Sequence, residues 1–346
     1  MPFTAQELAY AANAAIDFHL KGKFKAQTIQ KKPLLKKLME KQKTFPTSKE
    51  NITGGVKGEY SGTVQGFSGD DTVTFYNPAN GKRWSFPWKQ LHLGIQVTMT
   101  ELLKSGISVV DTDGAKTSKH SDAEQAVLVD MLDDKLDDMR ESWERGMNNM
   151  LWRDGTQDAS LVPGIQSFIT TTPTVGTTGG IDRVVNTWWR NRANLAIASN
   201  STTWANQPLI RQLQLDMRQL VKTGKGPDIA VAGSDFLDAL EMELRANGTF
   251  TQDGWAKKGR IDVSVADIAF KGLEFEYDPT LDDEGLDKYC FLLDTNAIRL
   301  RVMEGEDKKQ HNPSRPADKY VIYRAMTWVG GLTVDQLNTS EVMSIA

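Results

Sequence analysis

The sequence predicts an α+β fold, and three observations lead to that prediction. Candidate helices and strands are interleaved along the 346 residues without a fixed repeat, which excludes a solenoid. A glycine-rich, aromatic β segment occupies residues 54–108. After it, a helical pattern runs from Ser121 to Trp152, far beyond the average globular helix of about 11–12 residues.

Composition is that of an ordinary globular chain, with 39% hydrophobic and 25% charged residues, long enough for two domains. The single cysteine, Cys290, lies in an apolar run, so we expect a buried thiol and no disulfide framework. Residues 1–20 lack a secretory signal pattern, and no run of 18 apolar residues exists, so no membrane partner is expected.

Residues 1–53 read as a basic, helical arm. Residues 1–50 carry ten lysines and four acidic residues, a net charge of +6. Apolar spacing predicts a short helix at Leu34–Met39, with Pro33 in its first turn. The charge predicts an appendage that contacts something else, and the simplest partner is an acidic segment of a second copy. The lysines assigned to this contact are Lys21, Lys23, Lys25, Lys31 and Lys32.

Residues 54–108 predict a two-stranded hairpin. Val64–Phe67 and Thr72–Tyr76 are expected as strand pieces, and the residues at 77–81 form a strong turn signal. Lys82–Trp88 returns as a strand that places Trp84, Phe86 and Trp88 on one face. An isolated hairpin is only marginally stable in water, so this face must lie on another surface. That surface is either the chain's own domain or a neighbouring subunit.

The helix at 121–152 has one apolar stripe, formed by Leu128, Leu132, Leu136, Met139, Trp143, Met147 and Met150. Residues 119–158 carry five basic and eleven acidic residues, a net charge of −6. Asp130, Asp133, Asp134, Asp137 and Asp138 form an acidic run, which we interpret as a solvated face rather than a cation site. Gly146 interrupts the helix and is either a bend point or a close-packing position.

Mixed α and β signals follow. A strand is expected at Val184–Arg192, and Ser234 is expected to cap a helix at Asp235–Ala246. The other expected elements are a helix at Pro208–Thr223 and strands at Asp228–Ala232, Leu273–Tyr277, Tyr289–Leu293, Ile298–Val302 and Tyr320–Trp328.

No motif for catalysis emerges. The four histidines are scattered, and the zinc-protease, nucleophile-elbow, phosphate-loop and dinucleotide patterns are missing. We therefore predict no catalytic residue, no cofactor and no metal, and the chain is not expected to be an enzyme.

The order of these modules resembles the major capsid proteins of tailed bacteriophages, which have the Hong Kong 97-like fold. Short phrases carry the same resemblance: Val162–Gln166, Gly179–Asp182, Trp188–Asn191 and the closing strand Tyr320–Gly331. The resemblance implies an N-terminal arm at 1–53, an extended loop at 54–108 and a peripheral domain at 109–200 with a spine helix at 121–152. It further implies an axial domain at 201–305 and a return to the peripheral domain at 306–346.

The implied function is self-assembly, as pentamers and hexamers, into the icosahedral shell that encloses the double-stranded DNA of a tailed phage. Trp84, Phe86 and Trp88 would then contact a neighbouring subunit. The acidic face of the spine helix would repel packaged DNA, with which the shell would make no sequence-specific contact. A separate scaffolding protein and a portal are the expected partners, and a decoration protein is an open alternative. The protein would be assembled in the host cytoplasm and reside in the virion.

Two alternatives remain at this stage. The first is an encapsulin-like compartment that encloses a cargo enzyme. The second, from another class, is a soluble enzyme or carbohydrate-binding protein that uses the aromatic residues as a platform. The second alternative needs a concave site with converging polar groups, of which the sequence gives no sign.

Overall fold

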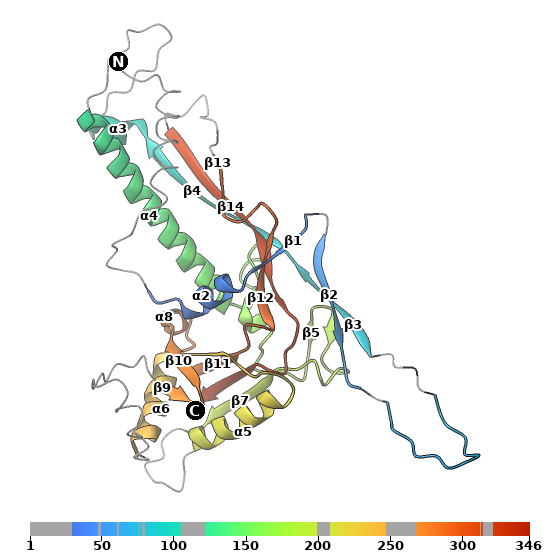
Figure 1. Cartoon of the computed structure of the whole chain (residues 1–346). Helices are drawn as coiled ribbons and strands as arrows, with labels where there is room; N and C mark the ends of the chain where they lie inside the picture. Colours follow the sequence, from blue (N-terminus) through green and yellow to red (C-terminus); the bar gives the residue numbers. More distant parts are fainter. Residues whose placement is uncertain are drawn as a thin grey trace. The chain divides into compact units, whose positions relative to one another are not determined.

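The computed structural model describes residues 30–47, 50–60, 62–75, 77, 80–104, 122–198, 208–246, 268–311, 313 and 321–346 (Figure 1). For residues 99, 102–103, 122–134, 245–246 and 268 it describes only the backbone. The chain divides into two compact units. The first comprises Met1–Gln30, Gln90–Met147 and Met303–Val329, and the second comprises Lys31–Lys89, Asn148–Val302 and Gly330–Ala346. The five-part division given above cuts the chain elsewhere, and its boundaries stay a prediction.

The first unit is built on the long helix α4 (Asp122–Trp152), which belongs to this unit as far as Met147. Its boundaries agree with the predicted helix to within one residue. In the described part of the apolar stripe, Leu136, Met139, Trp143 and Met147 are buried and Met150 is half-buried. The Trp143 ring lies 6.4 Å from that of Trp328, between ring centroids, so one strand of this unit packs on the helix.

That strand is β14 (Val321–Val334), whose N-terminal part pairs antiparallel with β13 (Lys309–His311) and also pairs with β4 (Lys89–Thr98). A short helix, α3 (Met99–Lys104), follows β4, and its Glu101 lies 3.7 Å from the Lys135 ammonium of α4. The first unit is therefore a helix held against a small sheet.

The core of the second unit is a mixed six-stranded sheet in the order β7-β15-β11-β8-β10-β9. Its strands are β7 (Arg192–Ile197), β15 (Glu341–Ile345), β11 (Tyr289–Leu293), β8 (Ile229–Ala232), β10 (Leu273–Tyr277) and β9 (Ile268–Phe270). The β7–β15 and β8–β10 pairs are parallel and the other pairs are antiparallel. Two amphipathic helices, α5 (Pro208–Lys222) and α6 (Ser234–Ala246), bury their apolar residues in the same core as these strands (Figure 1). Cys290 is fully buried there, as expected, and burial raises the pKa of its thiol.

The remaining elements of the second unit are smaller. They are α2 (Pro33–Glu40), β1 (Lys43–Phe45), β2 (Asn51–Lys57), β3 (Gly81–Pro87), the 3₁₀ turn η1 (Ile165–Ser167), β5 (Thr177–Thr178), β6 (Ile181–Asp182), α8 (Pro279–Asp283) and β12 (Ile298–Met303). β1 pairs with β12, and β12 pairs with the C-terminal part of β14. β2 pairs with β3, and β5 with β6, each as an antiparallel hairpin. None of the helices in the described ranges is long and apolar enough to cross a membrane.

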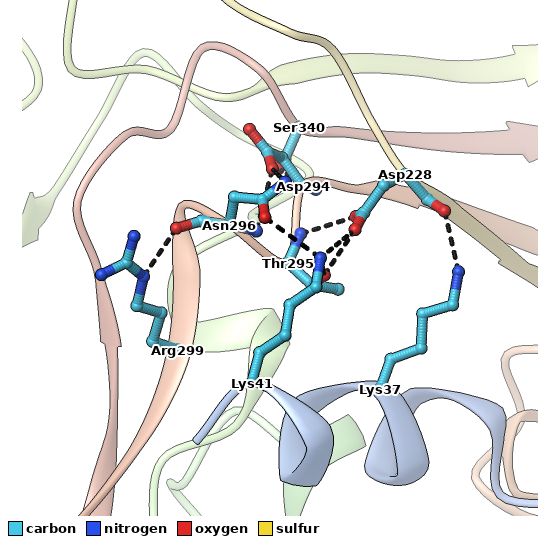
Figure 2. A network of polar contacts seen from close by, with 8 residues as sticks. All are labelled: Lys37, Lys41, Asp228, Asp294, Thr295, Asn296, Arg299 and Ser340. Carbon is cyan, nitrogen blue, oxygen red and sulfur yellow. Dashed lines mark hydrogen bonds and ion pairs between the residues drawn. The ribbon is translucent and has the colours of Figure 1, made fainter. Parts of the chain in front are cut away.

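Helix α2 fixes part of the basic arm to the chain's own fold. Leu34, Leu35 and Leu38 are buried. Figure 2 shows the polar side of the contact, where the Lys41 ammonium lies 2.6 Å from an Asp228 carboxylate oxygen and 2.7 Å from the Thr295 hydroxyl. Lys37 donates to the Asp228 carbonyl at 3.0 Å. Partial burial alone would raise the pKa of Asp228, but the bonds from Lys41 and Thr295 lower it overall.

Three predicted strands do not form. The described parts of Val64–Phe67 and Thr72–Tyr76 have no partner strand, and Gln65 and Thr74 join through their side chains instead. The strand expected at Val184–Arg192 is also wrong, because this stretch is a series of turns and β7 begins only at Arg192. The Asp182 carboxylate accepts the Val184 N–H at 2.7 Å, and this local bond competes with strand formation.

The last turn of α4, which from Asn148 on belongs to the second unit, is seated on a buried carboxylate of the same unit. Asp278 has no exposed surface and accepts from the Asn148 amide at 3.2 Å, the Trp152 indole N–H at 2.8 Å and the Thr280 N–H at 3.0 Å. Arg153, just after the helix, pairs with Glu284 at 2.8 Å. Uncharged donors therefore satisfy the buried Asp278, and they connect α4 to α8.

We expect Asp278→Ala to destabilise the protein by about 2–4 kcal/mol, because three buried donors lose their acceptor. Urea denaturation measures this change. Asp283→Ala is the matched control, since Asp283 is an exposed carboxylate on the same helix. Equal stabilities for the two variants would contradict the assigned role of Asp278.

Stability should also depend on pH through Glu341 of β15. Burial first, and then the adjacent charge of Asp216, raise the pKa of Glu341 to about 8. Both carboxyl groups are buried and accept from Asn194, at 2.7 Å for Glu341 and 2.6 Å for Asp216, and Arg192 donates to Asp216 at 3.0 Å. The Cys290 thiol also senses the charge of Glu341. Because the folded pKa exceeds the unfolded value, the native state keeps a proton that the unfolded chain has released.

Native stability should therefore fall as the pH rises from about 4.5, the ordinary pKa of a glutamate, through the folded pKa of Glu341, about 8. Glu341→Gln removes the titrating group and should flatten this dependence, measured as the urea midpoint across that range. Glu274→Gln, at an exposed position of β10, should leave the slope unchanged. An unaltered slope in Glu341→Gln would contradict the assignment.

Candidate inter-subunit surface

The aromatic residues of the β2–β3 hairpin lie inside the chain's own fold. Trp84 and Phe86 are 2% and 5% exposed. Their ring centroids are 5.3 Å apart, and the Phe86 ring meets that of Phe168 edge-on at 5.3 Å. The Arg301 guanidinium lies 5.6 Å from the Trp84 ring.

Glycines make this packing possible. A Cβ on Gly54, which pairs with Trp84 across the hairpin, would lie 2.2 Å from the Trp84 ring. A Cβ on Gly179, in the turn between β5 and β6, would lie 2.8 Å from the Phe86 ring. The Gly179 carbonyl also accepts the Ser85 N–H at 2.9 Å. The Trp84 and Phe86 rings are thus packed between the backbone of β2 and the β5–β6 turn.

The expectation that Trp84 and Phe86 contact a neighbouring subunit is therefore wrong, because neither side chain is exposed. Alternation correctly placed both rings on one face, but it could not show what covers that face. Trp88, after β3, is half-buried, and its contact with a neighbour stays a prediction.

The exposed aromatic surface lies further along the same hairpin. We call the described residues between Gly58 and Asn80 the aromatic loop. It closes where the Gly58 N–H donates to the Asn80 carbonyl at 2.8 Å, and it turns back where the Ser68 N–H donates to the Asp71 carboxylate at 2.9 Å. In Figure 1 it leaves the β2–β3 hairpin as a long, narrow excursion without strands.

Apolar side chains of the aromatic loop are uncovered. Tyr60, Phe67 and Phe75 are 85%, 70% and 96% exposed, and Val64 and Val73 are exposed as well. Single exposed apolar side chains are common, whereas several close together in the sequence indicate a candidate interaction site. Sequence reasoning missed these residues, since their only signal was an apolar pattern without a partner strand.

The other predicted contact residues are placed only in part. Lys21, Lys23 and Lys25 lie outside the described residues, whereas Lys31 is exposed and Lys32 is half-buried ahead of α2. The side chains of Asp130, Asp133 and Asp134 are also outside the described set. Asp138 is exposed and Asp137 half-buried, but Lys135, Arg140 and Arg145 accompany them, so this part of α4 is mixed in charge.

Gly146 lies within the continuous helix α4 and is exposed. Among the described residues, no atom outside the helix's own backbone lies within 4 Å of the place where its Cβ would be, so this part of the chain does not pack closely on Gly146. The alternative that Gly146 is a bend point stays a prediction.

Among the described residues, no group of three or more histidine, cysteine or acidic side chains could hold a metal ion. The buried Arg183 has a pKa lowered to about 10 by desolvation, and it donates to the Thr170 hydroxyl at 2.7 Å and to the Phe168 carbonyl. These bonds tie Arg183, just after β6, to the segment at Phe168–Thr170, so this buried charge has a structural role.

No family model and no curated protein matches the sequence. Among solved structures, the chain is similar to the capsid asymmetric unit of cyanophage A-1(L), with 14% identity, a TM-score of 0.62, and coverage of 94% of this chain and 96% of that one. The capsid of Myoviridae phage XM1 gives 13% identity, a TM-score of 0.53, and coverage of 95% and 96%. The capsid of a native GTA particle gives 13% identity, a TM-score of 0.55, and coverage of 97% and 98%. The chain thus has, over nearly its whole length, the fold of phage capsid structures, and the predicted α+β capsid fold is confirmed.

We expect Gly54→Ala to destabilise the protein by roughly 1–3 kcal/mol, because the added methyl group collides with the buried Trp84 ring. Gly55→Ala is the matched control on the same strand, since none of the described residues other than its chain neighbours comes within 4 Å of its Cβ position. Thermal unfolding measures both variants. If Gly54→Ala were as stable as Gly55→Ala, the packing of Trp84 described above would be incorrect.

Proposed function

We propose that this chain is a major capsid protein, which self-assembles into the icosahedral shell around the double-stranded DNA of a tailed phage. One observation carries the proposal: phage capsid structures match 94–95% of the chain. A second observation supports it: the aromatic loop exposes Tyr60, Phe67 and Phe75, and this exposure is unfavourable for an isolated monomer.

Assembly would remove the cost of that exposure. Burying one large apolar side chain contributes about 1.5–3 kcal/mol. A loop that buries several such side chains on a neighbour would therefore link copies firmly. Because each copy both gives a loop and receives one, the contact is heterologous and can close into rings.

A structural role is proposed in place of a catalytic one. The similar solved structures are capsids, and the buried polar groups found above connect secondary-structure elements instead of lining a reaction site. An encapsulin-like compartment and a soluble enzyme or carbohydrate-binding protein are less favoured, since the comparisons name capsids and the aromatic face expected as a platform is buried.

The remaining partners are proposals as well. They are a scaffolding protein, a portal, a decoration protein and packaged DNA, with assembly in the host cytoplasm and residence in the virion. Contact of Lys21, Lys23 and Lys25 with a neighbour, an interior position for the acidic part of α4, and bending at Gly146 belong to the same proposal. The arm contact would start ahead of α2, because α2 itself is docked on its own chain.

Replacing Phe67 and Phe75 together by serine should abolish shell formation and leave the folded monomer intact. Both side chains are exposed, so stability should change by no more than about 0.5 kcal/mol per substitution. Size-exclusion chromatography followed by negative-stain electron microscopy measures assembly, and urea denaturation measures stability.

Met242→Ser is the control, since Met242 is an exposed apolar residue on α6, away from the loop in sequence. Closed shells from the unsubstituted protein and from Met242→Ser are expected. An unsubstituted protein that stays monomeric at high concentration with scaffolding supplied would overturn the proposed function. Shells from the double serine variant would overturn only the role of the loop.

A further inference from the structure

The turn signal at residues 77–81 lies at the neck of the aromatic loop, and it ends in an asparagine followed by a glycine. Asn80 is the last residue of the loop, and Gly81 is the first residue of β3. Asn80 is half-buried and Gly81 is exposed. The backbone nitrogen of the next residue can attack an asparagine side chain, and glycine hinders this attack least because it has no Cβ. The chemistry of this site therefore depends on whether the Gly81 nitrogen is free.

The ladder between β2 and β3 leaves the Gly81 N–H unused. The Gly58 N–H donates to the Asn80 carbonyl at 2.8 Å, so these two residues form a hydrogen-bonded pair. Hydrogen-bonded and non-hydrogen-bonded pairs alternate along an antiparallel ladder. Gly81, which faces Lys57, thus belongs to a non-hydrogen-bonded pair, and its N–H points away from β2. Ser85 lies four residues further along β3, in the same type of pair, and its N–H likewise points outward and donates to the β5–β6 turn.

Little restrains the Asn80 side chain. Its amide donates to the Glu59 carbonyl at 3.2 Å, which is the long end of the normal range, and this bond is exposed. Asn80 also lies where the ladder ends, and the ends of secondary-structure elements open more readily than their centres. The side chain can therefore leave this bond and turn toward the exposed Gly81 nitrogen.

We infer that Asn80 is a site of spontaneous deamidation, driven by attack of the Gly81 nitrogen on its side chain. The nitrogen gives its proton to a base in the solvent and bonds to the Asn80 Cγ, and the amide group takes up a proton and leaves as ammonia. Water then opens the resulting succinimide at either carbonyl carbon. Opening at Cγ gives aspartate, and opening at the former backbone carbonyl gives isoaspartate. The net change is the uptake of water and the loss of ammonia, without oxidation or reduction.

Both products place a new carboxylate at the neck of the aromatic loop. Residues 58–80 already carry Glu59, Asp70 and Asp71 and no lysine or arginine, so the new charge adds to a negative segment. Isoaspartate also lengthens the backbone by one carbon just before Gly81, which changes how the loop joins β3. The reaction needs only the folded chain, so it is independent of whether copies assemble.

Peptide mapping of the full-length protein, aged at mildly alkaline pH, tests the inference. Trypsin releases residues 58–82 as one peptide, because the chain has lysines at 57 and 82 and no lysine or arginine between them. Part of this peptide should gain the mass difference between an acid and an amide, at a rate that rises with pH. Isoaspartyl methyltransferase should methylate the isoaspartate form. Asn77 cannot contribute by the same route, since it precedes Pro78, whose nitrogen carries no proton.

Gly81→Ala is the matched control. None of the described residues other than its chain neighbours comes within 4 Å of the Cβ position, so alanine fits there, but its Cβ hinders the attack and the aged peptide should keep its mass. Equal modification of this variant would overturn the assigned route. A synthetic peptide of residues 58–82 gives the rate without the fold. If that peptide deamidates while the folded protein remains unmodified, the fold protects Asn80 and the inference is overturned.

Discussion

The packing of Trp84 and Phe86 inside the chain is the interaction on which the candidate assembly surface depends. These rings fix β3 against Phe168 and the β5–β6 turn, and Gly54 and Gly179 leave the space that the rings fill. Because the base of the hairpin is held in this way, the aromatic loop has a fixed point of departure. Its own apolar residues are exposed, and none of the described parts of the chain covers them. The hairpin thus extends past the surface that supports it: Trp84 and Phe86 are buried at its base, and the apolar residues of the loop beyond are exposed.

Polar groups determine where the longer elements attach within the second unit. Asp228 receives Lys41 of the arm, and Asp278 receives Trp152 at the end of α4. In each case a carboxylate that is partly buried (Asp228) or fully buried (Asp278) collects several donors from distant parts of the sequence, which compensates its desolvation. An apolar contact tolerates sliding, whereas such a network accepts one arrangement. The arm helix and the end of the long helix therefore have defined positions on this unit.

Sequence patterns predicted the elements better than their surroundings. The stripe that includes Leu136, Met139 and Trp143 predicted the long helix almost to the residue. Apolar spacing with a period of 3.6 residues indicates a helix whatever the helix packs against. Alternation gave the shared face of Trp84 and Phe86, but burial by one's own chain and burial by a neighbour produce the same alternation. The strand expected at Val184 failed because β-propensity describes a side chain, whereas the Asp182 carboxylate acts on the backbone N–H. The exposure of Phe67 and Phe75 depends on tertiary packing that no local pattern contains.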